Sequence, residues 1–223
     1  MNHFKVSFII LIALFFSSQT SAQFGLRVKS NINNFPTWNR MIQESLTQEN
    51  DVLTSNFELG LDYRFKMKNI RIDILNEITY GFRSESILTN FSGMQFSYFA
   101  FNINTQIYAF NLHRENGIDK TLHPRHLLDN LFFTLSPGIV FHRTVVSHGL
   151  ILLPTLPSDQ ISLKLGTGVG FDFKIGDSFI ISPCITYNYI HNIELLLSPV
   201  SIPPSETGKT NLHQFQFHLR FGF

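Results

Sequence analysis

Serine and histidine residues near one predicted rim of the molecule are the first candidates for chemistry. Ser147 could act as a nucleophile, with His142 or His191 as its base, as in a lipid-modifying membrane enzyme. That reaction needs a nucleophile, a base and an orienting acid within hydrogen-bond reach. No motif fixes this geometry, and the sequence has neither a nucleophile elbow nor a phosphate-binding loop. We therefore interpret these side chains as rim residues and do not expect an enzyme.

The sequence contains no pattern that is specific for a metal or cofactor site. Three histidines share the predicted link 111–130, namely His113, His123 and His126. Two of them could approach one metal ion, but histidines often occur in loops without a metal. Cys184 is the only cysteine, which excludes an intramolecular disulfide and a multi-cysteine zinc site. The segment GTGVG (166–170) is not followed by a helical pattern, so it does not indicate a dinucleotide site. We expect no cofactor and no metal.

The composition points away from an ordinary soluble protein. The chain has 223 residues, enough for one domain with a sizeable core. Its 17 Lys and Arg nearly balance its 16 Asp and Glu, so nothing supports a nucleic-acid partner. Charged residues make up 15% of the chain, against roughly 25% in typical soluble proteins. With 24 Phe as well, the chain is poorly equipped to cover itself with a water-facing surface.

The first 22 residues have the pattern of a secretory signal peptide. A short basic stretch, Met1–Lys5, precedes an apolar run over 6–16, and Thr20–Ala22 supplies small residues for cleavage. The apolar run is shorter than the ~18 residues that a membrane-spanning helix needs. The expected organisation is therefore a signal peptide over 1–22 and one domain over 23–223.

Eight later segments alternate between apolar and polar residues. The clearest is HQFQFHLRFGF (213–223), in which every second residue is apolar. In the segment 178–194, the same alternation assigns Asn188 and Asn192 to the polar face. A period of two predicts β-strands. The predicted strands are 23–34, 54–66, 69–84, 94–110, 131–145, 159–174, 178–194 and 210–223.

The length and the two faces of these strands predict the fold class. Most are longer than the five or six residues usual in soluble sheets, and they suit a tilted bilayer crossing, which takes about 9–11 residues. We predict an all-β protein, an eight-stranded antiparallel transmembrane β-barrel of the up-and-down type. The apolar face contacts lipid and the polar face lines a closed lumen filled by side chains. The alternative is an exported soluble sandwich or a lipocalin-like barrel.

Charges of both signs are predicted to point into the lumen. Two interpretations remain: a buried ion-pair network that plugs the barrel, which we favour because buried charges need partners, and a path for ions or solutes. The predicted network consists of Arg27, Lys29, Glu58, Asp62, Arg64, Arg71, Asp73, Glu77, Lys164, Asp172 and Arg220.

The links between strands predict the orientation. In outer-membrane barrels the periplasmic turns are short and the outer loops are long. The links 67–68 and 175–177 are tight, whereas 35–53, 85–93, 146–158 and 195–209 are medium or long. This pattern places both termini in the periplasm of a Gram-negative bacterium, with the barrel in its outer membrane. The long link 111–130 is the exception on the periplasmic side.

Prolines and glycines inside the strands have structural interpretations. Pro137 and Pro183 each remove a ladder donor, which we attribute to local bulges, with a seam or partner contact as the alternative. Gly166, Gly168 and Gly170 are expected to let their strand bend where the barrel closes.

The outer loops and the C-terminus supply the candidate contacts with other molecules. Phe221 and Phe223 form the aromatic end that barrel-insertion machinery reads in many outer-membrane proteins. Exposed apolar residues usually mark a partner surface, although here they could also extend the lipid belt. The candidate contact residues are Trp38, Met41, Ile42, Leu150, Ile151, Leu152, Leu196 and Val200.

The sequence resembles the PorT-like outer-membrane β-barrel proteins of the Bacteroidota over nearly the whole mature chain. The resemblance is carried by the strand segments FGLRVKSNIN (24–33), FELGLDYRF (57–65), LSPGIVF (135–141), LKLGTGVGFDF (163–173), ISPCITYNYIHNI (181–193) and HQFQFHLRFGF (213–223).

The lack of a catalytic constellation or an evident pore, together with the apolar loops and the long link 111–130, indicates an accessory or scaffold subunit of a larger outer-membrane complex. The resemblance implies that this complex acts in protein secretion or outer-membrane assembly. The expected partners are the lipid bilayer with its lipopolysaccharide, other outer-membrane proteins and the insertion machinery. A small-solute pore and a membrane-embedded lipid-modifying enzyme are the alternatives.

Overall fold

The computed structural model describes residues 22–37, 55–67, 70–88, 92–110, 127–148, 158–176, 179–195 and 208–223. Its elements are β1 (Ala22–Asn34), β2 (Ser55–Lys66), β3 (Ile72–Leu88), β4 (Ser92–Tyr108), the 3-10 helix η1 (Leu127–Asn130), β5 (Leu131–His148), β6 (Ser158–Phe171), β7 (Phe173–Ile175), β8 (Phe179–Leu195) and β9 (Gly208–Gly222). The strands agree with the predicted ranges to within a few residues. The predicted signal peptide stays a prediction, because residues 1–21 lie outside the described part.

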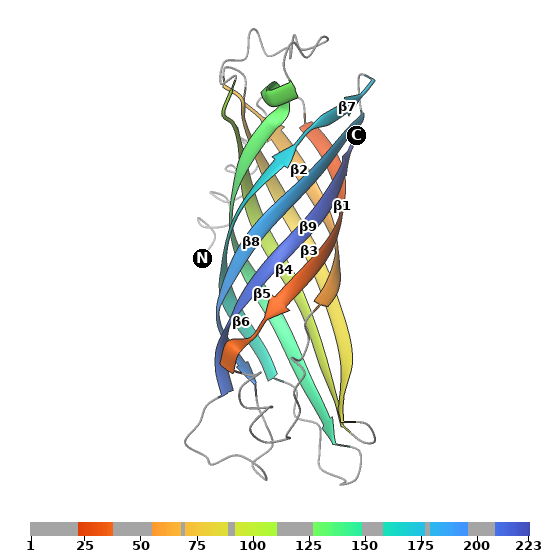
Figure 1. The fold of residues 1–223 in the computed structure, drawn as a ribbon, viewed down its shortest axis with the longest axis vertical. Coiled ribbons are helices and arrows are strands. Elements are labelled where there is room, and N and C mark those ends of the chain that lie inside the picture. Colours follow the sequence, from red (N-terminus) through yellow and green to blue (C-terminus); the bar gives the residue numbers. More distant parts are fainter. Residues whose placement is uncertain are drawn as a thin grey trace, which may run out of the picture.

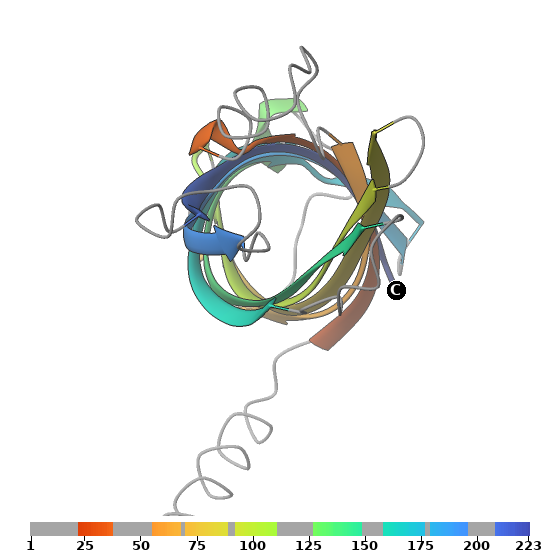
Figure 2. The same ribbon diagram turned by 90° about the horizontal axis from the view of Figure 1, so that it is seen from below.

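All strands join one antiparallel sheet that closes on itself. Every strand except β6 pairs with the next along the chain, β1 pairs with β9, and β6 pairs with β8. The short β7 continues β6 beyond Asp172 and also pairs with β8. Viewed along its axis, the sheet forms a complete ring of tilted strands (Figure 2). The predicted eight-stranded antiparallel barrel is confirmed, and closure leaves no long strand edge unpaired.

The register fixes the width of the barrel. A row of paired residues starts at Gly25 on β1 and passes once round the ring. If the pairing of Asn34 with His213 is continued by one row, this row ends at Phe35. Phe35 lies one residue beyond β1 and ten residues beyond Gly25. That row runs through Asp62, Glu77, Asn102, Gly138, Lys164, Ile190 and Leu212. Eight strands with this stagger tilt by about 40° and enclose a space that side chains alone can fill.

The side chains alternate between the two faces as the period of two predicts. On β5, Phe132 is 0% exposed in the lumen, whereas its neighbour Phe133 is 50% exposed on the outside. The exposed large hydrophobic residues cover the outer surface of the long strands. From Phe133 to Phe141, eight residues along β5, the rise along the axis is about 20 Å. This height is close to the ~25 Å apolar band of known membrane barrels.

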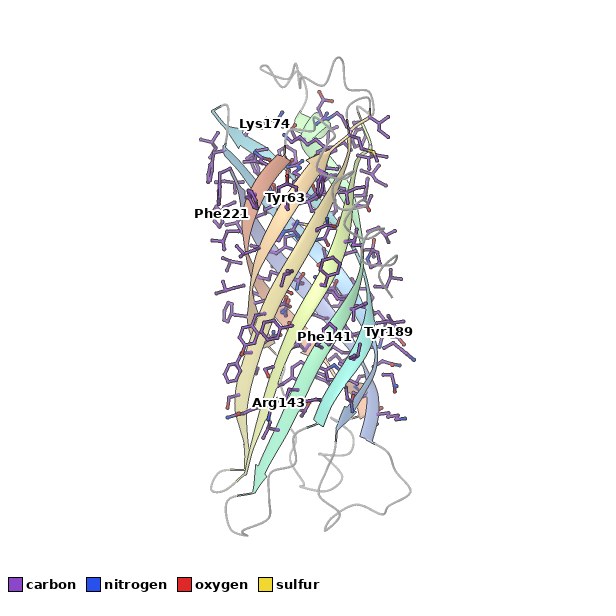
Figure 3. The ribbon with its side chains drawn as sticks, turned by 180° about the vertical axis from the view of Figure 1, so that it is seen from behind. Tyr63, Phe141, Arg143, Lys174, Tyr189 and Phe221 are labelled. Atoms are coloured by element: carbon purple, nitrogen blue, oxygen red, sulfur yellow. The ribbon has the colours of Figure 1, made fainter. Side chains whose placement is uncertain are left out.

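Aromatic and charged side chains mark the two borders of this band. Tyr63, Phe221 and Lys174 lie toward the end that carries β7, and Phe141 and Tyr189 lie toward the opposite end (Figure 3). On the outer surface, Tyr63 contacts Phe24 and Phe65 through edge-to-face rings, and Tyr187 and Tyr189 contact His213. Aromatic girdles of this kind flank the lipid-facing surface of membrane barrels.

The two strand prolines interrupt the ladder without a change of register. Pro137 pairs with Leu165 on β6, but the rows opposite Ser136 and Pro137 are missing on the β4 side. Pro183 pairs with Leu219 on β9 and lies opposite the break between β6 and β7. The register is the same on both sides of each gap, so the prediction of local bulges was wrong. Each proline simply lacks the N–H that one neighbouring strand would need.

A bulge occurs instead at Asn192 on β8. The register against β9 shifts between Ile190 and Ile193, and Asn192 has a φ of 60°. Its backbone N–H donates to the side chain of Asn211 at 3.1 Å. The extra residue reverses the alternation, so that Ile190 and Ile193 both point inward and Asn192 is exposed. The assignment of Asn192 to the inner face was therefore wrong.

The ends of the barrel differ in their connections. The C-terminus, β7 and η1 lie at one end, the upper one in Figure 1. β2 and β7 end at this same end, and β3 and β8 begin there, with only residues 67–71 and 176–178 between them. Gly176 has a φ of 65°, which glycine adopts without strain in a tight turn. Among the described residues, no helix has the length and hydropathy of a membrane-spanning helix.

Candidate functional site

The inner face of the barrel gathers the charged residues predicted from the sequence. All eleven are buried, from Arg27 on β1 to Arg220 on β9. They come from β1, β2, β3, β6 and β9 and from two short segments next to strands, because the period of two turns every second side chain inward. An open channel would leave its wall side chains exposed to water, whereas the charged side chains of this lumen are almost completely enclosed.

Asp62 joins two arginines that face each other across β1 and β9. Its carboxylate accepts from Arg27 Nε at 2.8 Å and from Arg220 Nε at 2.9 Å. Arg220 NH2 lies 2.8 Å from the same carboxylate. Such bidentate contacts are the strongest type of protein ion pair.

Glu77 lies at the centre of a second group. It lies 2.5 Å from Lys29 Nζ and 3.4 Å from Arg27 NH1, and it accepts from Asn104 Nδ2 at 2.6 Å. Lys29 Nζ also lies 3.7 Å from Glu58. Arg27 therefore links the Asp62 and Glu77 groups into one network across β1, β2 and β3.

A third group lies at the end of the barrel that carries β7. Arg64 Nε donates to Asp73 at 2.8 Å, and Arg64 NH2 donates to Asp172 at 2.8 Å. Tyr108 donates to Asp172 at 2.5 Å and contacts Arg64. The guanidinium of Arg71 lies 4.5 Å from the centre of the Tyr108 ring. Asp172 fills the break between β6 and β7, where Ser182 also donates to it at 2.6 Å.

A layer of amides and one tyrosine extends the network toward the other end. Gln216 Nε2 donates to Asn31 at 2.7 Å and to Glu58 at 3.0 Å, and Tyr98 also contacts Glu58. Asn33 Nδ2 donates to Asn56 at 2.8 Å. Glu58 is the only member of this layer in the predicted network, although every member lies at an inward position of a predicted strand.

Aromatic side chains also point inward near both ends of the network. Phe35 and Phe96 pack edge to face with 5.7 Å between ring centres, as do Tyr108 and Phe132. These residues were missed because large aromatic residues were assigned to lipid. Parity along β4 and β5 would have placed Phe96, Tyr108 and Phe132 inside, and Phe35 continues the inward parity of β1 by one residue.

The strand glycines make room for these inward side chains. A Cβ atom on Gly166 would lie 2.3 Å from Asn188 Oδ1, and one on Gly170 would lie 2.4 Å from the Phe132 ring. On Gly222 it would lie 2.2 Å from Arg220 NH1. Crowding of the lumen therefore accounts for these glycines, and the bending of the strand at Gly166, Gly168 and Gly170 stays a prediction.

The residues considered for hydrolysis do not come together. His142 is buried in the lumen, where Nε2 lies 3.1 Å from Gln160 Oε1, whereas His191 is exposed on the outer face. The side chain of Ser147 lies outside the described part. The wall of the barrel separates the two histidines, so they cannot act on one substrate.

Other candidate residues fall on segments that the structure does not describe. These are the histidines of the 111–130 link and the loop residues Trp38, Met41, Ile42, Leu150, Ile151, Leu152, Leu196 and Val200. Within the described ranges, no three His, Cys, Asp or Glu side chains are close enough to hold a metal ion. At the C-terminus, Phe221 stacks on Phe179 and Phe223 is exposed, with its N–H donating to Phe24.

The outer surface carries a shallow apolar groove of about 700 Å³. Ile185, Phe217 and Leu219 form part of its floor, and it runs over Pro183 at the break between β6 and β7. The groove lies on the lipid-facing surface, so acyl chains would fill it.

Comparison with known proteins shows a shared fold. No protein-family model matches the sequence. No curated protein matches it either. Among solved structures, the attachment invasion locus protein Ail of Yersinia pestis matches with a TM-score of 0.52 and 10% identity, over 91% of this chain and 97% of Ail. Neisserial surface protein A matches with a TM-score of 0.48 and 11% identity, over 91% of this chain and 97% of that one. The chain therefore has the fold of the small outer-membrane β-barrels.

Proposed function

We propose that this protein is a closed, non-conducting outer-membrane barrel that serves as an accessory or scaffold subunit of a larger outer-membrane complex. The observation that carries the proposal is the filled lumen. Arg27, Asp62 and Glu77 lie across the interior in one ion-pair network, and their side chains are almost completely buried. A barrel without a water-filled path offers its outer face and its connections, rather than its interior, for function.

The outer surface supports a location within a bilayer. Isolated charges are costly on a lipid-facing wall, and the middle of this wall consists of apolar residues such as Leu61, Ile103 and Leu163. Aromatic residues at both borders fit the two membrane interfaces. The tight connections lie at the end that holds the C-terminus, which supports a periplasmic location for both termini.

The resemblance to the PorT-like proteins supports a more specific cellular role. It favours a role in protein secretion or outer-membrane assembly and a host among the Bacteroidota. Other outer-membrane proteins would be the partners, with lipopolysaccharide around the barrel and the insertion machinery acting during biogenesis.

Two measurements on the full chain test this proposal. In a planar bilayer, the refolded barrel should show no stable conductance steps. In native gels of gently solubilised outer membranes, it should migrate in a complex well above its own mass of 25.7 kDa. Stable ohmic steps together with monomeric migration would overturn the scaffold role and favour a small-solute pore. Release of acyl chains from added lipopolysaccharide, seen by mass spectrometry, would favour the lipid-modifying enzyme.

A further inference from the structure

The described lumen contains one more buried cation than buried carboxylates. The carboxylates are Glu58, Asp62, Asp73, Glu77 and Asp172, and the cations are Arg27, Lys29, Arg64, Arg71, Lys164 and Arg220. A buried charge without a counter-ion is costly.

Lys164 is the cation that the network leaves without a partner. Its side chain is buried at 5% exposure, yet it forms no ion pair and no hydrogen bond with the described residues. Its charge interacts with those of Lys29, Glu58 and Glu77. The two glutamates already contact Lys29.

Asn102 brings a second unpartnered polar group to the same place. Asn102, Gly138 and Lys164 occupy one row across β4, β5 and β6. A Cβ atom on Gly138 would lie 2.4 Å from Asn102 Oδ1, so the amide of Asn102 lies over this glycine, between its own strand and Lys164. Asn102 is 0% exposed, and neither the nitrogen nor the oxygen of its amide has a hydrogen-bond partner among the residues that the structure describes.

From this arrangement we infer that the lumen binds one small monovalent anion, such as chloride or bromide, between Lys164 Nζ and the amide of Asn102. Lysine offers three N–H donors and asparagine two, and rotation of the amide aims its nitrogen at the ion. One negative charge balances the single excess cation. An anion with two charges would leave one negative charge without a partner.

Refolding in bromide tests the inference directly. Crystals of the full barrel refolded in bromide should show an anomalous peak within hydrogen-bond distance of both Lys164 Nζ and Asn102. The Lys164→Met variant should lose this peak, because it removes the excess charge. The matched control Lys174→Met changes an exposed lysine on β7 and should keep it. Wild-type crystals without a lumenal peak, or with bromide on the surface only, would overturn the site.

A second measurement covers the case in which Lys164→Met does not fold. The wild-type barrel, refolded with the sodium salts of chloride, bromide or gluconate at equal ionic strength, should unfold at a higher temperature in the halides than in gluconate, because gluconate is too large for the site. Identical unfolding temperatures in all three salts would contradict a bound anion. This measurement reports only on anion binding in the lumen. Its result is therefore distinguishable from the conductance and native-gel results that test the scaffold role.

Discussion

Removing one carboxylate from the centre of the lumen should destabilise the barrel strongly. Asp62 pairs with Arg27 at 2.8 Å and with Arg220 at 2.8 Å. In Asp62→Asn, Arg27 keeps Glu77 at 3.4 Å, but Arg220 has no other carboxylate partner within the described structure. Leaving a buried charge without its partner costs about 3–5 kcal/mol. We expect the free energy of unfolding to fall by that amount.

The chain provides a matched control on its own surface. Arg143 and Asp159 form an ion pair at 3.7 Å, and their side chains are 56% and 71% exposed. Exposed pairs contribute about 0–1 kcal/mol, so Asp159→Asn should have little effect. Urea titration of both variants in lipid vesicles, followed by the heat-dependent shift of the folded band on gels, measures the difference. Equal effects of the two substitutions would refute the dry ion-pair plug and favour a wet lumen.

Three further expectations follow from the same geometry. Phe217→Arg places a charge on the lipid-facing wall and should lower the free energy of unfolding by about 2–4 kcal/mol near the bilayer centre. Gln216→Arg should lower it less, because its arginine can pair with a lumenal carboxylate, and refolding both variants into vesicles compares them. Gly222→Ala should lower the free energy of unfolding by about 1–3 kcal/mol because its methyl group overpacks the lumen. Gly176→Asn should leave it nearly unchanged because asparagine tolerates positive φ, and urea unfolding tests both variants. Cys184 is buried, so maleimide should label it only after unfolding, and rapid labelling of the folded barrel would contradict the closed lumen.

The alternation of side chains made most of the fold predictable from the sequence. A period of two assigns every residue of a strand to one face, and burial of charge decides which face points inward. Arg27, Glu77 and the other charged candidates were assigned to the inner face in this way, and all of them are buried. It failed at Asn192, where one extra residue reverses the phase and no local sequence signal reveals it.

Other features depended on contacts that a single strand does not display. Phe96 and Phe132 looked like lipid-facing residues by type, and only their parity and the register of the neighbouring strands place them inside. The missing N–H of Pro137 interrupts the hydrogen bonds to β4 but not the pairing with β6. Which of the two neighbouring strands is affected depends on the register of the sheet. Pairing partners such as Asp62 with Arg220 depend on barrel closure, which brings residues 158 positions apart into contact.

Neighbouring residues of one strand face lipid and lumen in turn, and Phe132 and Phe133 on β5 allow the two faces to be compared within one strand. In a Trp38→Phe background, Phe132→Trp and Phe133→Trp each introduce one fluorophore at an aromatic position. After refolding into vesicles of lipids brominated along their acyl chains, we predict strong quenching of the tryptophan at 133 and little quenching at 132. Equal quenching at both positions, or quenching at neither, would contradict the lipid-facing barrel.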